Sequence, residues 1–499
     1  MGDKDIVLTK VQQNCVDYPE EKNLLVRGIA GSGKSLVLER RALKIFMKNK
    51  MKETPPSIAL FTYTNSLVNF MKESIADLDL DGGKFEISTL DKEIFSLFSL
   101  FKNSVSPVEK TYSFTNRRAP KTAAVYEDVL KHYEVAFKGW RFWGKELRDY
   151  LEDEFQWMKQ HQLTSLVDYI DCDRKGRGKV RLSMEDKSKM YSIYDSLYSE
   201  LERNNLYDIN MICNYIIDHA DEIPDSYKYD YVMIDEAQDL AVNKLKIARI
   251  LAKHSMTISA DFAQKIYKTG FTWKEVGIDI KGSASKKLKG TYRNTKEIAE
   301  LANCLKDNNS ELKNMSEDEY NQQELPDRHG NIPSLIYEDS SKQEKKDVIK
   351  LISDILDERP DTRIAILAYN TKFENKLNEW FEGSKIPFQI ISKKRENTIL
   401  SPGVKIVTFH SSKGLEFDTV IIPHIEKGIF MLRKRKDFEE DESEAREDYL
   451  NLARNLLYVG MTRAKFQLYM FTVKNENEAA FPSPLLEELD EGMMKVQRL

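Results

Sequence analysis

A phosphate-binding motif lies near the start of the chain, at Gly28-Ile29-Ala30-Gly31-Ser32-Gly33-Lys34-Ser35. It fits the pattern G-x-x-x-x-G-K-[ST] without a mismatch. Glycines at these positions let backbone N–H groups turn toward phosphate oxygens at the positive end of a following helix. In such a loop Lys34 reaches the outer phosphates and the Ser35 hydroxyl ligates Mg²⁺. The motif therefore predicts binding of a nucleoside triphosphate with Mg²⁺, against the alternative of a chance glycine turn.

Two adjacent acids, Asp235 and Glu236, directly follow the apolar run Tyr231-Val232-Met233-Ile234. Acids at the end of a buried strand are costly unless they hold a cation or take part in chemistry. Asp235 suits the Mg²⁺ shell, and Glu236 could orient or deprotonate a water aimed at the γ-phosphate. The pair therefore indicates that the triphosphate is hydrolysed.

Strands and helices alternate around these residues in the manner of a doubly wound parallel sheet. Strands are predicted at residues 23–27, 57–61, 85–89, 231–234 and 256–260. A second alternation, without a glycine loop of its own, has strands at 363–367, 387–391, 404–408, 419–423 and 466–470. Because the carboxyl ends of parallel strands carry the binding site, the strand-end stretch Thr62-Tyr63-Thr64-Asn65 is a candidate contact. The fold class is α/β, with two parallel sheets flanked by helices.

The region from 95 to 204 differs from its surroundings, because aromatic and charged helices dominate it. We expect it to be a helical insertion in the first α/β domain. Its two basic loops, at 117–121 and 174–179, are equally compatible with solvated loops and with nucleic-acid contacts. The expected domains are 1–94 plus 205–282, the insertion 95–204, and 283–499.

Composition limits the compartment and the partners. With 499 residues, 41% of them hydrophobic, several cores can form. The sequence has no apolar run of membrane-span length and no signal-peptide pattern. Four scattered cysteines predict reduced thiols in the cytoplasm, and neither they nor the seven histidines show metal-ligand spacing. The net charge of −5 restricts any nucleic-acid contact to a local groove.

The order of the motifs resembles superfamily 1 helicases of the UvrD, Rep and PcrA type. The matching segments are 8–12, 28–35, 61–65, 234–239, 260–267, 292–295, 407–417 and 458–464. The resemblance implies two RecA-like domains that close on ATP and Mg²⁺. It also implies movement along single-stranded nucleic acid, with DNA and the 3′→5′ direction favoured and RNA left open.

The resemblance carries roles onto individual residues. The implied catalytic residues are Lys34, Asp235, Glu236, Gln264, Arg293 and Arg463, the two arginines being fingers from across the cleft. Besides the phosphate loop, the implied nucleotide contacts are Gln12 and Tyr292 on the adenine, Glu416 on the ribose, and Gln238 and Gln264 near the γ-phosphate. The candidate strand contacts are Thr62, Tyr63, Asn65, Thr408 and His410. For Tyr63, a buried strand-end aromatic stays the alternative to a stacking platform.

Four departures from the family limit these expectations. The family's Trp-Arg pair is replaced by Thr269 and Gly270, for which Phe271 or Trp273 could substitute. An arginine under the adenine is replaced by Leu36, and the stretch at 88–91 differs from the usual Thr-Phe-His-Ser. Finally, the link 391–404 has room for just the 12 residues 392–403, so the second accessory domain is absent there.

Two functions remain open at this point. The favoured one is an ATP-dependent translocase or helicase on single-stranded nucleic acid, with autonomous unwinding in doubt. The alternative is an ATP-gated regulatory or remodelling subunit of a DNA-repair or anti-phage defence complex. In that case a protein partner, such as a nuclease, would supply further activity.

Overall fold

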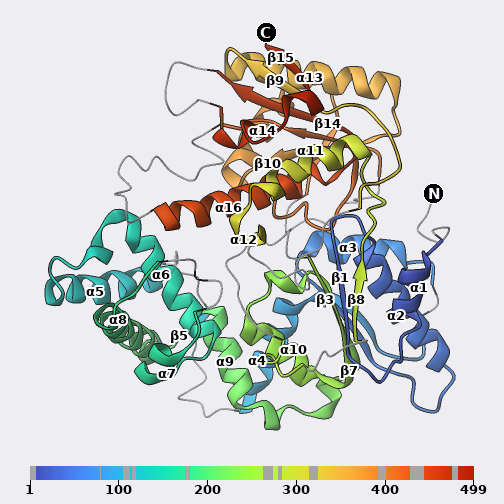
Figure 1. Ribbon diagram of the computed structural model, residues 1–499. Coiled ribbons are helices and arrows are strands. Elements are labelled where there is room, and N and C mark those ends of the chain that lie inside the picture. Colours follow the sequence, from blue (N-terminus) through green and yellow to red (C-terminus); the bar gives the residue numbers. More distant parts are fainter. Residues whose placement is uncertain are drawn as a thin grey trace.

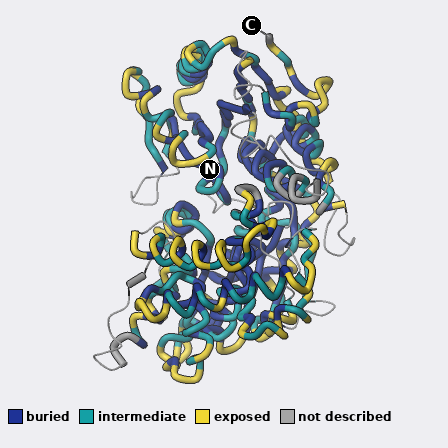
Figure 2. The backbone as a smooth tube through the Cα atoms, turned by 90° about the vertical axis from the view of Figure 1, so that its left-hand side faces the viewer, coloured by how far each residue is buried: buried dark blue, intermediate teal, exposed yellow. Residues whose placement is uncertain are grey.

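The computed structural model describes residues 7–78, 80–104, 113–114, 120–174, 177, 180–261, 273–278, 284–313, 324–391, 401–426, 443–474 and 482–498. Two parallel β-sheets covered by helices lie one above the other, and a helical insertion lies beside the lower sheet (Figure 1). The buried residues lie within each of these bodies, and the exposed residues lie around them (Figure 2). The predicted α/β fold with two parallel sheets is thus confirmed.

The first sheet carries the phosphate loop. Its strands, in spatial order, are β3 (Phe85–Thr89), β2 (Ile58–Thr62), β6 (Tyr229–Ile234), β7 (Ala252–Ala260), β1 (Leu24–Gly28) and β8 (Ser285–Leu288). The helices around it are α1 (Lys10–Val16), α2 (Lys34–Asn49), α3 (Asn65–Ser74), α4 (Leu90–Ser104), α9 (Ile209–Asp218) and α10 (Val242–Leu251). Apolar clusters cover both faces, which is why β1, β2 and β6 contain continuous apolar runs.

The basic run at 286–289 forms most of an edge strand rather than a free patch. β8 pairs with β1 in parallel, with Leu288 opposite Gly28. Lysines on an exposed edge strand discourage pairing with other chains. β8 lies beyond the expected domain limit at 282, so the first sheet extends past that limit.

α4 also crosses an expected limit, the one between residues 94 and 95. Its residues Leu97 and Phe98 pack in the same apolar cluster as Val232 of β6. The insertion proper therefore begins after α4 in the structure. The domain limits themselves stay a prediction.

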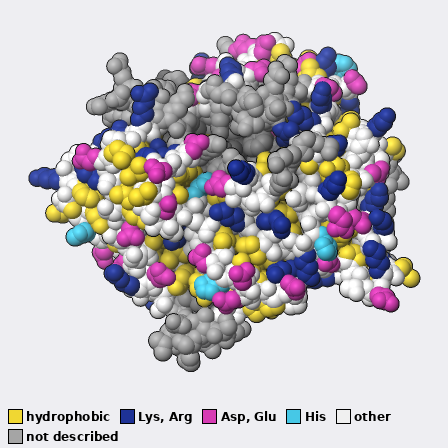
Figure 3. Space-filling model, turned by 60° about the horizontal axis from the view of Figure 1, so that its bottom comes forward, with side chains coloured by type: hydrophobic (Ala, Val, Ile, Leu, Met, Phe, Trp, Pro, Cys, Tyr) yellow, Lys and Arg dark blue, Asp and Glu magenta, His cyan; other side chains and the backbone are white. Residues whose placement is uncertain are grey.

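The insertion has its own core. Its helices are α5 (Pro120–Ala136), α6 (Lys145–Gln160), α7 (Leu166–Asp171) and α8 (Met184–Arg203), and a two-stranded parallel sheet joins β4 (Ser113–Phe114) to β5 (Leu206–Tyr207). Apolar residues of α5, α6 and α8 form one cluster. On the face of the whole molecule that Figure 3 shows, basic and acidic side chains are interspersed.

Two arginines of the second basic loop lie inside this core. Arg174 and Arg177 form ion pairs with Glu154, at 2.9 and 2.7 Å, and Glu154 is fully buried. Burial alone would raise the pKa of Glu154, but the two guanidiniums lower it to about 2. These two arginines therefore have a structural role. The other basic residues of that loop, and Arg117, Arg118 and Ala119 of the first loop, lie outside the described residues.

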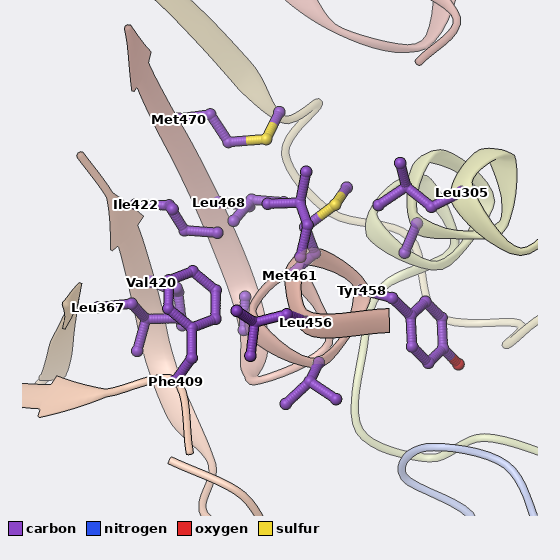
Figure 4. Packing of buried hydrophobic residues seen from close by; sticks show 14 of the residues in the cluster. Leu305, Leu367, Phe409, Val420, Ile422, Leu456, Tyr458, Met461, Leu468 and Met470 are labelled. Atoms are coloured by element: carbon purple, nitrogen blue, oxygen red, sulfur yellow. The ribbon is translucent and has the colours of Figure 1, made fainter. Parts of the chain in front are cut away.

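The second sheet has seven parallel strands. In spatial order they are β11 (Phe388–Ile390), β12 (Gly403–Thr408), β10 (Arg363–Ala368), β13 (Phe417–Ile422), β14 (Ala464–Val473), β9 (Ser334–Glu338) and β15 (Lys495–Arg498). Its helices are α11 (Lys296–Asp307), α12 (Ser310–Lys313), α13 (Ser341–Glu358), α14 (Thr371–Glu382) and α16 (Ser443–Met461). Phe409, Leu456 and Met461 pack against β13 and β14 in its core (Figure 4). β9 and β15 were not predicted from the sequence.

No helix of the described ranges is both long enough and apolar enough to span a membrane.

Candidate nucleotide-hydrolysis site

The phosphate loop joins β1 to α2 and requires glycine at two positions. Gly31 and Gly33 have φ angles of 71° and 81°, in the left-handed region that side chains disfavour. A Cβ on Gly31 would lie 2.5 Å from Cβ of Arg293, and one on Gly33 would lie 2.5 Å from Nε2 of Gln12. The loop therefore has close neighbours on both sides, and a side chain at either glycine would displace them.

Lys34 is buried and folded back over its own loop. Its Nζ donates to the carbonyl oxygens of Gly28 and Ile29, at 3.1 and 3.0 Å, and pairs with Asp261 at 3.3 Å. Asp261 follows β7, so the lysine connects two neighbouring strand ends. The two carbonyl oxygens and the Asp261 carboxylate accept hydrogen bonds from the Lys34 ammonium group, as phosphate oxygens would.

Ser35 and Asp235 form an oxygen pair suited to Mg²⁺. The Ser35 hydroxyl donates to Oδ2 of Asp235 at 2.5 Å, and Ser259 donates to the other carboxylate oxygen. Burial, followed by the charge of Glu236, raises the pKa of Asp235, so a nearby cation would stabilise its ionised form. Close by in the loop, the buried Ser32 hydroxyl has no hydrogen-bond partner in the described structure. The oxygens of Ser35 and Asp235 are ligands of the kind that Mg²⁺ prefers, and the Ser32 hydroxyl can donate a hydrogen bond to a phosphate oxygen.

Glu236 is held in a strained conformation between two polar side chains. Its φ of 55° is uncommon for a residue other than glycine and occurs often at functional sites. Gln238 donates to Oε2 of Glu236 at 2.5 Å, and Lys413 lies 3.4 Å from the same oxygen. Although burial would raise the pKa of Glu236, the charges of Lys413 and Lys34 lower it. Glu236 is therefore an ionised carboxylate at neutral pH, the form that a general base needs.

Lys413 is a residue whose role the sequence reasoning missed. It lies in the loop after β12 of the second sheet and makes a buried ion pair with Asp239, which follows β6 of the first. The next residue, Gly414, has a φ of 82°, and its ideal Cβ would lie 2.8 Å from Cδ2 of Leu67 in α3. The loop after β12 thus contacts the first domain through an ion pair, Lys413 with Asp239, and through the close packing of Gly414 against Leu67. The motif at 407–417 contained Lys413, but its partner was not evident from the sequence.

Arg293 pairs with Glu416, which brings two predicted site residues together. Arg293 Nε lies 2.8 Å from Oε1 of Glu416, and Lys465 lies 3.4 Å from the other oxygen. Burial would raise the pKa of Glu416, but these two cations lower it to about 2. Arg293 also follows β8 closely, and the N–H of Tyr292 donates to the Gly31 carbonyl at 2.9 Å. Arg293 is therefore attached to the first sheet as well as to the second.

Arg463 lies buried at the end of α16. It donates to the carbonyl oxygens of Val459 at 2.9 Å and Leu415 at 3.4 Å. Burial, and then the charge of Arg293, lower the pKa of Arg463 to about 9. The positive charge of Arg463 also helps to lower the pKa of Glu236. Arg463 is thus directed into the same site from the second sheet.

The two predicted adenine contacts differ in their surroundings. The side chain of Gln12 is buried, accepts from the N–H of Thr9 at 2.9 Å and donates to the Ser32 carbonyl at 2.9 Å. Both ends of its amide are therefore engaged, in a capping box and in support of the loop. Tyr292 is 58% exposed, so its ring is accessible to a base.

The five candidate strand contacts have unequal access. Thr62 and Thr408 are buried, and their hydroxyls bond to Thr64 and Ser411 in the following turns. Tyr63 is half-buried against the core of the first sheet, whereas Asn65 is exposed and His410 half-buried. Trp273 also packs against that core. The predicted residues Gln264, Thr269, Gly270 and Phe271 lie outside the described residues.

A glycine loop, a lysine, a Ser–Asp oxygen pair and an ionised glutamate thus gather where β1 and β6 end, between two parallel sheets. These features define a phosphate-loop protein with two RecA-like domains.

Comparison with known families gives the narrower class. Residues 8–272, more than half of the chain, match the UvrD/REP helicase N-terminal domain, and residues 391–475 match the UvrD-like helicase C-terminal domain. The chain therefore belongs to the UvrD/Rep helicase family, whose members are ATP-hydrolysing DNA helicases. The resemblance inferred from the motifs is confirmed.

Individual relatives match over shorter stretches. The ATP-dependent DNA helicase PcrA of Staphylococcus aureus is 23% identical over 312 residues, which cover 59% of this chain and 39% of PcrA. The DNA helicase II of Rickettsia typhi is 34% identical over 96 residues, which cover 19% of this chain and 13% of the relative. The chain thus spans less than half the length of these relatives. The PRRSV helicase structure matches with 11% identity and a TM-score of 0.32, over 92% of this chain and 53% of that one.

Proposed function

We propose that this chain hydrolyses ATP and uses the energy to move along single-stranded nucleic acid, with DNA and the 3′→5′ direction favoured. One observation carries the proposal. The carboxylate of Glu236 is held by Gln238 from the first sheet and by Lys413 from the second. Because a single catalytic group contacts both bodies, hydrolysis depends on their relative position, which supports coupling to movement.

Each site residue has a step in this mechanism. Lys34 would exchange its carbonyl partners for the outer phosphates, and Ser35 with Asp235 would hold Mg²⁺, which would offset phosphate charge. Glu236 orients a water and accepts its proton. Arg293 and Arg463 neutralise the charge that develops on the γ-phosphate. Gln238 then relays the state of Glu236 to Asp261, whose N–H it accepts at 2.9 Å.

The nucleic-acid strand would cross the strand ends of both sheets. Asn65 and His410 are the candidates with open surface, and Thr62 and Thr408 would act through the turns they cap. Such contacts position the backbone without reading sequence. The comparisons lend no support to the alternative of a regulatory subunit, and we propose that the protein works in the cytoplasm.

The decisive experiment is the ATPase rate with no nucleic acid, with single-stranded DNA, with single-stranded RNA and with duplexes bearing either overhang. We expect single-stranded DNA to stimulate hydrolysis at least tenfold, roughly 1.4 kcal/mol off the barrier. A Lys34→Ala variant gives the background rate. An ATPase that single-stranded DNA leaves unchanged would contradict the proposal.

A further inference from the structure

A buried group of one imidazole and two carboxylates lies in the second domain. Glu344 is in the first turn of α13, and His424 and Glu426 follow the end of β13. The three side chains are 0%, 4% and 6% exposed. One ligand atom from each lies within 4.8 Å of the others. Buried groups of this kind are costly unless something compensates their charge.

The atoms of this group approach one another closely. Nδ1 of His424 lies 2.7 Å from Oε2 of Glu344 and 3.8 Å from Oε1 of Glu426. Backbone groups orient both carboxylates, because the His424 N–H donates to Oε1 of Glu344 at 2.7 Å and the Val473 N–H donates to Oε1 of Glu426 at 3.3 Å. Ligands bound at about 2.0–2.2 Å around one ion lie about 3.0–3.5 Å from each other, between these two separations, so small shifts of the side chains would admit an ion.

An unpartnered buried atom provides a second observation. Oε2 of Glu344 is buried without a hydrogen-bond partner in the described structure, although Nδ1 of His424 lies 2.7 Å from it. Two atoms that are close but not aligned as donor and acceptor have the relation of two ligands directed at a third atom.

The neighbourhood also carries surplus negative charge. Within the described ranges, no lysine or arginine forms an ion pair with Glu338, Glu344 or Glu426. A cation at this point would offset that charge.

We propose that Glu344, His424 and Glu426 bind a divalent transition-metal ion of the Zn²⁺ or Mn²⁺ kind. An imidazole nitrogen with two carboxylate oxygens suits these ions better than Mg²⁺ or Ca²⁺, which prefer oxygen alone. Glu416 precedes β13 and His424 follows it, so the six residues of the strand, about 20 Å, separate this site from the nucleotide. The ion would tie α13 to the loop after β13.

Zinc titration of the full-length, metal-free chain tests the proposal in the absence of nucleotide. Isothermal titration calorimetry with Zn²⁺ should give one site per chain and a higher unfolding temperature on saturation. Glu344→Gln and Glu426→Gln should each weaken Zn²⁺ binding at least tenfold. His329→Gln is the matched control, because His329 makes the same 2.7 Å contact with Glu297 on the surface. Absence of zinc binding, or equal affinity in all variants, would overturn the proposal.

Cobalt substitution gives an answer that needs no folded variant. Co²⁺ bound to wild-type chain with alkylated cysteines should show the absorption of nitrogen and oxygen ligation. A thiolate-to-metal band before alkylation that vanishes afterwards would place the ion at Cys15, Cys172, Cys213 or Cys304 instead. An imidazolium ion held between the carboxylates, without a metal, predicts no cobalt spectrum at all.

Discussion

At the scale of single residues, the proposed hydrolysis depends most on the side chains of Glu236 and Lys34. Glu236→Gln removes the base but keeps the shape, so turnover should fall at least about 100-fold. Lys34→Ala should abolish turnover, because the outer phosphates lose their cation. Steady-state ATPase assays measure both. Lys44→Ala, in the same helix and exposed, is the control that should retain activity. Turnover at the wild-type rate in Glu236→Gln would refute its assignment as the base.

Arg463 should separate binding from hydrolysis. Arg463→Ala should lose about 10³-fold or more in turnover while most nucleotide affinity remains, because a finger acts on charge that develops during the reaction. The change also removes the hydrogen bond to the Leu415 carbonyl, whereas the Val459 carbonyl still accepts from the Thr462 hydroxyl. An unpaired buried carbonyl costs about 1–3 kcal/mol. Arg454→Ala is a control for lost stability alone, because Arg454 lies in α16, just before Arg463 in the chain, and pairs with Glu447 and Glu488. Equal losses of affinity and turnover in Arg463→Ala would contradict a finger role.

At the scale of elements, Lys413 connects the loop after β12 to the end of β6. The pKa of Glu236 is lowered to about 2, and Lys413 is the chief cation responsible. We therefore expect activity to be lost only as pH falls through this lowered pKa. Lys413→Met should raise this pKa and move the acidic limb of the pH–rate profile to higher pH. It should also cost about 3–5 kcal/mol, because it breaks a buried ion pair.

Lys405→Met is the matched control for that experiment. Lys405 is a buried lysine of β12 that bonds to Gln389 and Ser401 rather than to a carboxylate. Its loss should lower stability without moving the pH limb. An unmoved limb in Lys413→Met, or equal movement in both variants, would show that Lys413 does not tune Glu236.

Gly414 tests the shape of the same contact. Gly414→Ala should cost about 1–2 kcal/mol for its positive φ and about 1 kcal/mol more for the clash with Leu67. Gly403→Ala has a φ of 101° and open space around its Cβ, so it should show the first cost alone. Urea unfolding measures both. In a Leu67→Ala background the difference should vanish, and equal costs in the wild-type background would argue against the contact.

Which elements could be predicted follows from their burial. β2, β6 and β10 contain continuous apolar runs because both faces of each sheet are covered. β8 is a short edge strand, Ser285–Leu288, whose polar residues have no such signature. The motifs located Lys34, Asp235 and Glu236, because local spacing defines those sites. They could not assign Lys413 to Asp239, because that pair forms only when two distant loops meet.

At the scale of the whole molecule, the insertion has a core of its own and should unfold separately. Glu154→Gln leaves the guanidiniums of Arg174 and Arg177 without their buried partner, at a cost of about 3–5 kcal/mol. The unfolding of the insertion should shift to lower temperature, while basal ATPase at low temperature changes little. Tryptophan fluorescence can follow it, because Trp140, Trp143 and Trp157 of the five tryptophans lie there.

The pH dependence of this ion pair has a defined sign. The pKa of Glu154 is lowered to about 2, so the pair stabilises the insertion above the ordinary value of about 4.3 and loses its effect as pH falls toward 2. Glu127→Gln, in an exposed pair with Lys131, is the control that should shift neither transition. A single transition that moves as one in Glu154→Gln would show that the insertion is not a separate unit.

The course of the chain through β8 makes the two arginines unequal partners of the nucleotide. β8 hydrogen-bonds to β1, and five residues later Arg293 lies against Gly31, so its backbone travels with the phosphate loop. Arg463 lies between the end of α16 and the start of β14, so it travels with the second sheet. If the sheets separate during the proposed cycle, we expect Arg463 to leave the phosphates, whereas the backbone of Arg293 stays with the phosphate loop and its pair with Glu416 breaks. Arg463 would then set the timing of hydrolysis, and Arg293 would stay beside the bound nucleotide.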